Sequence, residues 1–104
     1  MTERKKKPSA KAHAQKVGAA RYWAAYDAAM FVLKGDSRLV GLDKARGEMA
    51  HEAALRGTGF PDRPFNLSKR CGGPDKQMQV AVDEMLPQAI EAARQADFAK
   101  QVLR

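Results

Sequence analysis

Residues 19–33 read AARYWAAYDAAMFVL, and this stretch decides the fold because almost nothing in it favours contact with water. Arg21 and Asp27 are its only charged residues, and it holds four of the seven aromatic side chains of the chain. A helix that is apolar on nearly every face has to be covered by other helices. The stretch therefore predicts the central helix of a small bundle.

Two apolar stripes at helical spacing run along this stretch and predict two neighbouring helices. One stripe holds Ala19, Tyr22 or Trp23, Tyr26, Met30 and Leu33, and the other holds Ala20, Ala24, Ala28 and Phe31. In such apolar surroundings the aromatic residues are interpreted as core rather than as a stacking platform. Arg21 and Asp27 lie either on a narrow exposed edge or on a contact surface.

The composition favours an all-α fold. The chain has 104 residues, enough for one domain with a modest core. Alanine is abundant, whereas Ile occurs once and Thr twice, so a sheet would lack its usual β-branched residues. We expect a small bundle of three to four helices spanning residues 9–104, preceded by a disordered basic tail at residues 1–8.

Capping signals divide this domain into segments. The first helix is expected to start after Ser9 and to end at Gly35, and the second to run from Asp36 or Ser37 through Arg56. Residues 57–75 contain four glycines and three prolines, which predicts a long loop. Phe60, Phe65 and Leu67 are expected to attach that loop to the body.

The last segment, residues 76–104, has the most regular apolar pattern. A seam with alternating spacings of four and three comprises Met78, Val82, Met85, Ala89, Ala92, Ala96, Ala99 and Leu103. Pro87 interrupts it, so the segment is expected either to kink or to divide, with Pro87 opening a fourth helix. Because Leu86, Ile90 and Ala93 broaden the apolar face, the segment can pack on the body and still offer a strip to a partner.

The net charge of +7 lies mainly in the N-terminal residues. Residues 1–16 hold six basic side chains against Glu3 alone, while the rest of the chain is close to neutral. Basic arms bind phosphates without reading sequence, and a merely solubilising terminus is an equal alternative. The candidate nucleic-acid contacts are Arg4, Lys5, Lys6, Lys7, Lys11, Lys16, Arg63, Lys69 and Arg70.

Motifs for more specific chemistry are weak. Helix-turn-helix recognition is disfavoured because acidic residues are interspersed on the second helix. Glu48 and His51 have the spacing of a di-iron ligand pair, but such a site needs a second pair and two further glutamates. Cys71 lacks a base held near it, and the glycine pairs lack the ending of a phosphate-binding loop. We expect no enzyme activity, no cofactor and no metal.

A binding function is the main expectation. The leading hypothesis is a nonenzymatic adaptor or modulator that docks on another protein, or on itself as a homodimer, with help from the 57–75 loop. Its expected contact strip is Met85, Ala89, Ala92, Ala96, Ala99 and Leu103. The alternative is a small basic protein that associates with nucleic acid.

The composition also predicts where in the cell the protein acts. The single cysteine and the lack of a long apolar stretch indicate a cytoplasmic protein without membrane contact. Small basic helical chains without motifs are common among phage and mobile-element accessory proteins, which is an association only.

Overall fold

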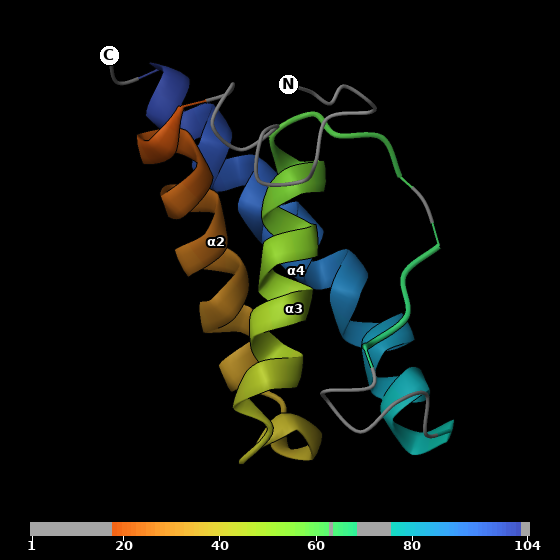
Figure 1. Ribbon diagram of the computed structural model, residues 1–104. Helices are drawn as coiled ribbons and strands as arrows, with labels where there is room; N and C mark the ends of the chain where they lie inside the picture. Colours follow the sequence, from red (N-terminus) through yellow and green to blue (C-terminus); the bar gives the residue numbers. More distant parts are fainter. Residues whose placement is uncertain (1–17, 63, 69–75, 103–104) are drawn as a thin grey trace, which may run out of the picture.

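The computed structural model describes residues 18–62, 64–68 and 76–102 of the chain. These residues form three α-helices and a short 3-10 helix, and they contain no strand (Figure 1). The elements are α2 (Ala19–Lys34), η1 (Ser37–Leu39), α3 (Asp43–Gly57) and α4 (Lys76–Val102). The expected all-α bundle is confirmed, with three helices.

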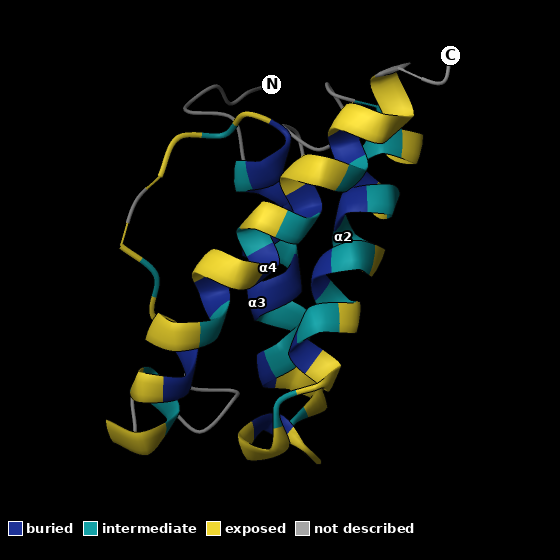
Figure 2. Ribbon diagram, turned by 180° about the vertical axis from the view of Figure 1, so that it is seen from behind, coloured by how far each residue is buried: buried dark blue, intermediate teal, exposed yellow. Residues whose placement is uncertain are grey.

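Each of the three helices packs against the other two. In Figure 1, α2 and α3 lie side by side and run in opposite directions, and α4 begins at the same end of the bundle as α3. Figure 2 shows that buried residues line the sides on which the helices face one another. The core therefore lies along a single axis between the helices.

The buried face of α2 shares Tyr22 and Leu33 with the first predicted stripe, whereas the second predicted stripe is partly or fully exposed. The buried residues are Tyr22, Ala25, Ala29 and Leu33. Of the second predicted stripe, Ala20 is exposed, and 82% of Phe31 is accessible to solvent. The expectation of a helix covered on nearly every face is wrong, because two neighbouring helices cover only one side of α2.

The start of the second predicted helix also differs from the expectation. The side chain of Asp36 accepts a hydrogen bond from the backbone N–H of Arg38 and caps η1 rather than an α-helix. Gly41 follows with a φ of 81°, a left-handed conformation that interrupts a right-handed helix. As a result, α3 begins only at Asp43.

Gly57 ends α3 as expected, and it also has a packing role. A Cβ atom on residue 57 would lie 2.6 Å from the Cβ of Ala93 and 2.9 Å from the backbone nitrogen of Arg94. No side chain fits at that distance. The missing Cβ is therefore what lets the end of α3 lie directly against α4.

The final helix is continuous through Pro87, so of the two expected alternatives the division into a separate fourth helix is wrong. Its buried residues are Ala81, Val82, Leu86, Ala89, Ala93 and Asp97. This set departs from the predicted seam, in which Ala99 is exposed. The difference arises because α4 packs against two helices and the loop, and not along a single seam.

The loop after α3 is attached to the body as expected. Leu67 is buried, and Phe60 and Phe65 pack against the core while remaining partly exposed. The backbone N–H and the hydroxyl of Ser68 donate to the carboxylate of Glu48 on α3, at 3.1 and 2.5 Å. Apolar and polar contacts thus attach residues 60–62 and 64–68 to the body of the bundle.

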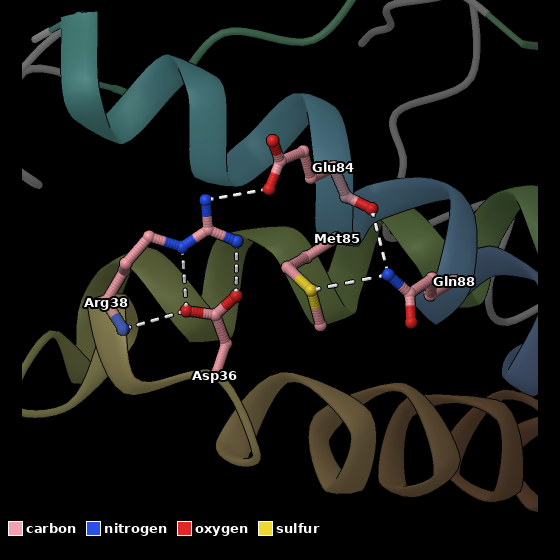
Figure 3. A network of polar contacts seen from close by, with 5 residues as sticks. All are labelled: Asp36, Arg38, Glu84, Met85 and Gln88. Carbon is pink, nitrogen blue, oxygen red and sulfur yellow. Dashed lines mark hydrogen bonds and ion pairs between the residues drawn. The ribbon is translucent and has the colours of Figure 1, made fainter.

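A polar network joins the connection between α2 and α3 to α4 (Figure 3). Arg38 donates to both carboxylate oxygens of Asp36, at 3.1 and 2.6 Å, and to Glu84 on α4 at 2.8 Å. Gln88 donates to the backbone oxygen of Glu84 and to the sulfur of Met85. Of these bonds, the one from Arg38 to Glu84 joins the η1 turn to the first half of α4.

Candidate functional site

The outer face of α2 carries the main exposed apolar surface of that helix. We use this name for Ala20, Trp23, Ala24, Asp27, Phe31 and Lys34, which repeat at helical spacing on the side away from the core. Ala24 is partly buried, and the other five residues are exposed. Charge is confined to Asp27 in its middle and Lys34 at its end.

Two aromatic side chains dominate this face. Trp23 is 54% exposed and Phe31 is 82% exposed. Eight residues of helix separate them by about 12 Å along the axis. The Trp23 ring makes edge contacts with Tyr22 and Tyr26, at centroid distances of 5.0 and 5.1 Å. Trp23 is therefore held in position by neighbouring rings, whereas Phe31 projects into solvent.

A pocket of about 550 Å³ lies beside α3, and we call it the α3 pocket. Its lining residues are Tyr22, Tyr26, Lys44, Gly47, Glu48, His51, Glu52 and Phe65. They come from α2, α3 and the loop, so the pocket exists only in the folded chain. Its volume falls in the range of small-molecule sites.

Hydrogen bonds fix several polar groups of the α3 pocket. The hydroxyl of Tyr22 lies 2.5 Å from Nδ1 of His51. Burial, reinforced by Tyr26, raises the pKa of Tyr22 to about 12, so its phenol is neutral at ordinary pH. Glu52 is almost fully buried and accepts a bond from Nε of Arg56 at 2.8 Å.

The Glu48 and His51 pair forms no metal site in the described part of the chain. Glu48 binds Ser68, and His51 contacts Tyr22. Among the residues that the structure describes, no three His, Cys, Asp or Glu side chains are grouped to hold an ion. His13 and Cys71 lie outside those residues.

A second pocket of about 420 Å³ lies between α4 and the loop. Its apolar lining comes from Phe65, Val82, Leu86, Pro87 and Ile90. Two arginines and two aspartates complete it, namely Arg56, Arg94, Asp62 and Asp83. With both signs of charge equally present, this pocket selects neither cations nor anions by charge.

The predicted contact strip on α4 does not form a continuous exposed surface. Ala89 is fully buried in the core, so it does not contact a partner while the bundle is folded. Met85, Ala92 and Ala96 are partly buried, and Ala99 is exposed. Leu103 lies outside the described residues. The physical reason is that α4 packs against both α2 and α3, which together cover part of the strip.

All nine predicted nucleic-acid contacts lie outside the described residues. The described body carries the basic residues Arg21, Lys34, Arg38, Lys44, Arg46, Arg56, Lys76, Arg94 and Lys100. It carries the acidic residues Asp27, Asp36, Asp43, Glu48, Glu52, Asp62, Asp83, Glu84, Glu91 and Asp97. Five of the nine basic side chains form ion pairs within the body. The positive charge of the protein therefore belongs to residues beyond the described body.

Sequence reasoning missed the outer face of α2 and the α3 pocket. The sequence contained a signal for the outer face. Apart from Phe31, the stripe that contains it consists of alanines, and each alanine buries little apolar area, so this stripe is the weaker candidate for the core. The pocket had no such signal, because its residues come from three separate segments. No protein-family model, no curated protein and no solved structure matches this chain. Within the described ranges, no helix is long and apolar enough to cross a membrane.

Proposed function

We propose that this protein is a nonenzymatic binding module that docks on another protein through the outer face of α2. The observation that carries the proposal is the exposure of Trp23 and Phe31 on one side of a single helix. Aromatic residues contribute a large share of the energy of protein interfaces, and tryptophan is among the most enriched. We place this activity in the cytoplasm on the basis of the single cysteine.

The chemistry of this face describes the partner it fits. Trp23 and Phe31 call for two apolar depressions about 12 Å apart on the partner, since they lie eight helical residues apart. Asp27 lies between them in sequence and is exposed, which favours a partner lysine or arginine near the centre of the contact. Ala20 and Ala24 flank Trp23 along the helix, and their small side chains allow close approach of the partner backbone.

The first experiment replaces Phe31 with a photoreactive phenylalanine analogue in living cells. Light then links the analogue to whatever covers the outer face of α2, and mass spectrometry identifies the product. The same analogue at Phe98 is the matched control, because Phe98 is also exposed but lies on α4. The proposal expects a product from position 31 that does not form from position 98.

Binding measurements with the purified partner then test the two anchors. Phe31→Ala and Trp23→Ala should each weaken binding about tenfold or more, as anchor residues do. Phe98→Ala should leave the affinity unchanged. Equal losses at all three positions, or no loss at any, would overturn the proposal. A product between two copies of this chain would make the partner a second copy, joined through α2 and not through the predicted strip on α4.

Nucleic-acid binding is the second candidate function, and the charge distribution favours it. The described body is close to neutral, so a run of six basic residues within positions 1–16 stands apart from it. Such a run, with Arg63, Lys69 and Arg70, matches a phosphate-binding arm whose affinity falls steeply with salt.

A salt series distinguishes the two candidates. The full chain and a version in which the six basic residues of positions 1–16 are glutamine are titrated against labelled duplex DNA and RNA. A steep salt dependence that disappears in the substituted chain supports nucleic-acid binding. No binding by the full chain at low salt contradicts it and leaves protein docking.

A further inference from the structure

We propose that the second pocket, between α4 and the loop, binds an uncharged aromatic ring that carries an N–H group, the chemistry of indole. We call it the α4 pocket, and its lining is Arg56, Asp62, Phe65, Val82, Asp83, Leu86, Pro87, Ile90 and Arg94. It shares no residue with the outer face of α2, so the inference goes beyond the proposed docking function. It rests on a juxtaposition of apolar side chains with a backbone carbonyl that lacks its usual helical donor.

The apolar side chains of the α4 pocket fit a flat ring. Val82 and Leu86 are 1% and 6% exposed, so they lie at its base. Phe65 from the loop and Ile90 from α4 are partly buried and pack against the core. A ligand ring against Phe65 gains aromatic contact in addition to the apolar area it buries. The volume of about 420 Å³ falls in the range of small-molecule sites.

A backbone carbonyl in the wall of the pocket provides the acceptor. In an α-helix the carbonyl of each residue points towards the N–H four residues later and accepts a hydrogen bond from it. The carbonyl of Asp83 points in this way towards Pro87, which has no N–H to donate. Because both residues line the α4 pocket, a ligand N–H there takes the place of the missing helical donor.

The polar side chains nearby bind other acceptors. Gln88 donates to the backbone carbonyl of Glu84, the residue after Asp83, at 3.2 Å (Figure 3). Gln79 donates to the side-chain carboxylate of Asp83 at 2.9 Å. Among the described residues, no side chain donates to the backbone carbonyl of Asp83. The ligand therefore competes with water alone for this acceptor within the described part of the chain.

The charged groups of the α4 pocket favour a neutral ligand. A ligand cation would face Arg56 and Arg94, and a ligand anion would face Asp62 and Asp83. Either ion would also lose hydration on entering a pocket whose base is apolar. An uncharged ring with one N–H meets neither cost and still satisfies the carbonyl.

The test is a titration of the full isotope-labelled chain with indole, followed through its backbone amide signals in NMR spectra. The matched probe is benzofuran, which keeps the fused-ring shape and has an oxygen in place of the N–H. The proposal expects saturable shifts at Phe65, Val82 and Ile90, with an affinity of about 1 mM for so small a ligand. Benzofuran should bind about fivefold more weakly, because one hydrogen bond is lost. Equal affinities, or no shift at these three residues, overturn the proposal.

A pair of variants tests the role of the Asp83 carbonyl. Pro87→Ala supplies the missing N–H and closes the helical bond, so the preference for indole over benzofuran should disappear. The loss of the proline ring weakens both probes alike, which leaves their ratio as the measurement. Asp83→Ala is the matched control, because it removes the side chain and keeps the carbonyl, so the preference should persist. A preference that survives in Pro87→Ala, or is lost in Asp83→Ala, overturns the proposal.

Charged relatives of the probe test the preference for a neutral ligand. Tryptamine carries an ammonium group and indole-3-acetate a carboxylate, whereas 3-methylindole carries neither. The proposal expects both charged probes to bind no more tightly than 3-methylindole. Binding of one of them that is about tenfold tighter would show that the pocket selects that ion, and the neutral ligand would be wrong.

The indole group comes either from a free small molecule or from a tryptophan side chain of another protein. Nα-acetyl-tryptophan methylamide carries the same ring on a peptide backbone and distinguishes the two sources. Affinity equal to that of 3-methylindole supports a tryptophan side chain as the ligand. Binding at the same residues that is weaker by about tenfold supports the free small molecule.

Discussion

Arg21 at the start of α2 and Asp97 near the end of α4 form a two-point ion pair. Nε of Arg21 lies 2.6 Å from one carboxylate oxygen of Asp97, and Nη2 lies 2.9 Å from the other. The hydrogen bond to Asp97 is the main cause that raises the pKa of Arg21. Two residues separated by 76 positions in the sequence thus fix one end of the α2–α4 contact.

Asp97→Asn should destabilise the fold measurably. The Asp97 side chain is 7% exposed, so its replacement leaves the Arg21 guanidinium without a buried anion. We expect the free energy of unfolding to fall by about 2 kcal/mol, measured by urea denaturation. Glu91→Gln is the control, because its pair with Arg94 is exposed and should contribute nothing measurable. If the two substitutions lower the free energy of unfolding equally, the Arg21–Asp97 pair contributes no more to stability than an exposed pair does.

Gly57→Ala and Gly47→Ala should change stability in opposite directions. At residue 57 the new methyl group would meet Ala93 at 2.6 Å, and the resulting shift of α3 from α4 should cost about 1–3 kcal/mol. At residue 47 the nearest atom is 3.7 Å away, so alanine should gain about 0.5–1 kcal/mol of helix propensity. Thermal denaturation of both variants checks this. A stabilised Gly57→Ala would contradict the close approach of the two helices.

Asp36 should make the stability depend on pH in the acid range. Hydrogen bonds from Arg38 hold the pKa of Asp36 below its ordinary value of 3.8. A carboxylate with a lower pKa in the folded state stabilises the fold above its ordinary value, and the contribution is lost as pH falls through the folded pKa. Asp36→Asn should therefore be less stable than the natural chain at neutral pH, and the difference should shrink below about pH 4.

Urea denaturation of both proteins across this pH range measures the difference. Glu91, whose pKa is lowered mainly by the hydrogen bond from Gln95, is present in both proteins, so its contribution cancels. A difference that stays constant down to the lowest pH would contradict the role of Asp36.

Tyr22 should ionise about two pH units later than a free tyrosine. In Tyr26→Phe it is the only tyrosine left, and its phenolate absorbance should appear near pH 12 rather than 10.0. Burial, the larger cause of the shift, remains in this variant. Because the folded pKa is raised, the stabilisation is complete below pH 10 and is lost as pH rises towards 12. The urea-unfolded variant should titrate near 10, and a midpoint near 10 in the folded chain would overturn the burial of Tyr22.

Local features of the sequence predict some helix ends correctly and others not. Gly57 ends α3 as its position predicts, whereas the predicted seam of residues 76–104 shares only Val82 and Ala89 with the buried residues of α4. The start of α3 was missed because the left-handed Gly41 and the η1 turn compete with a helix that Asp36 also favours. Pro87 lies inside α4, where packing on both neighbours outweighs one missing backbone hydrogen bond.

The candidate sites were harder to predict than the helices. Both faces of α2 contain alanines, and they differ in whether those alanines lie next to another helix. Because alanine occurs on both faces, its spacing in the sequence does not show which face is buried. Glu48 and His51 were noticed as a pair, yet each binds a residue from another element, Ser68 and Tyr22. Periodicity reports one helix at a time, so it does not reveal such contacts.

By itself, the sequence determined that this protein is an α-helical bundle, because alanine-rich apolar periodicity and the scarcity of β-branched residues leave no other core. It also determined that the positive charge lies mainly near the N-terminus. Only the tertiary structure decided that Ala25 and Ala29 are buried while Phe31 is exposed. The physical reason is that close helix contact needs small side chains, so at the interfaces of α2 the alanines face inward and the large Phe31 is left outside.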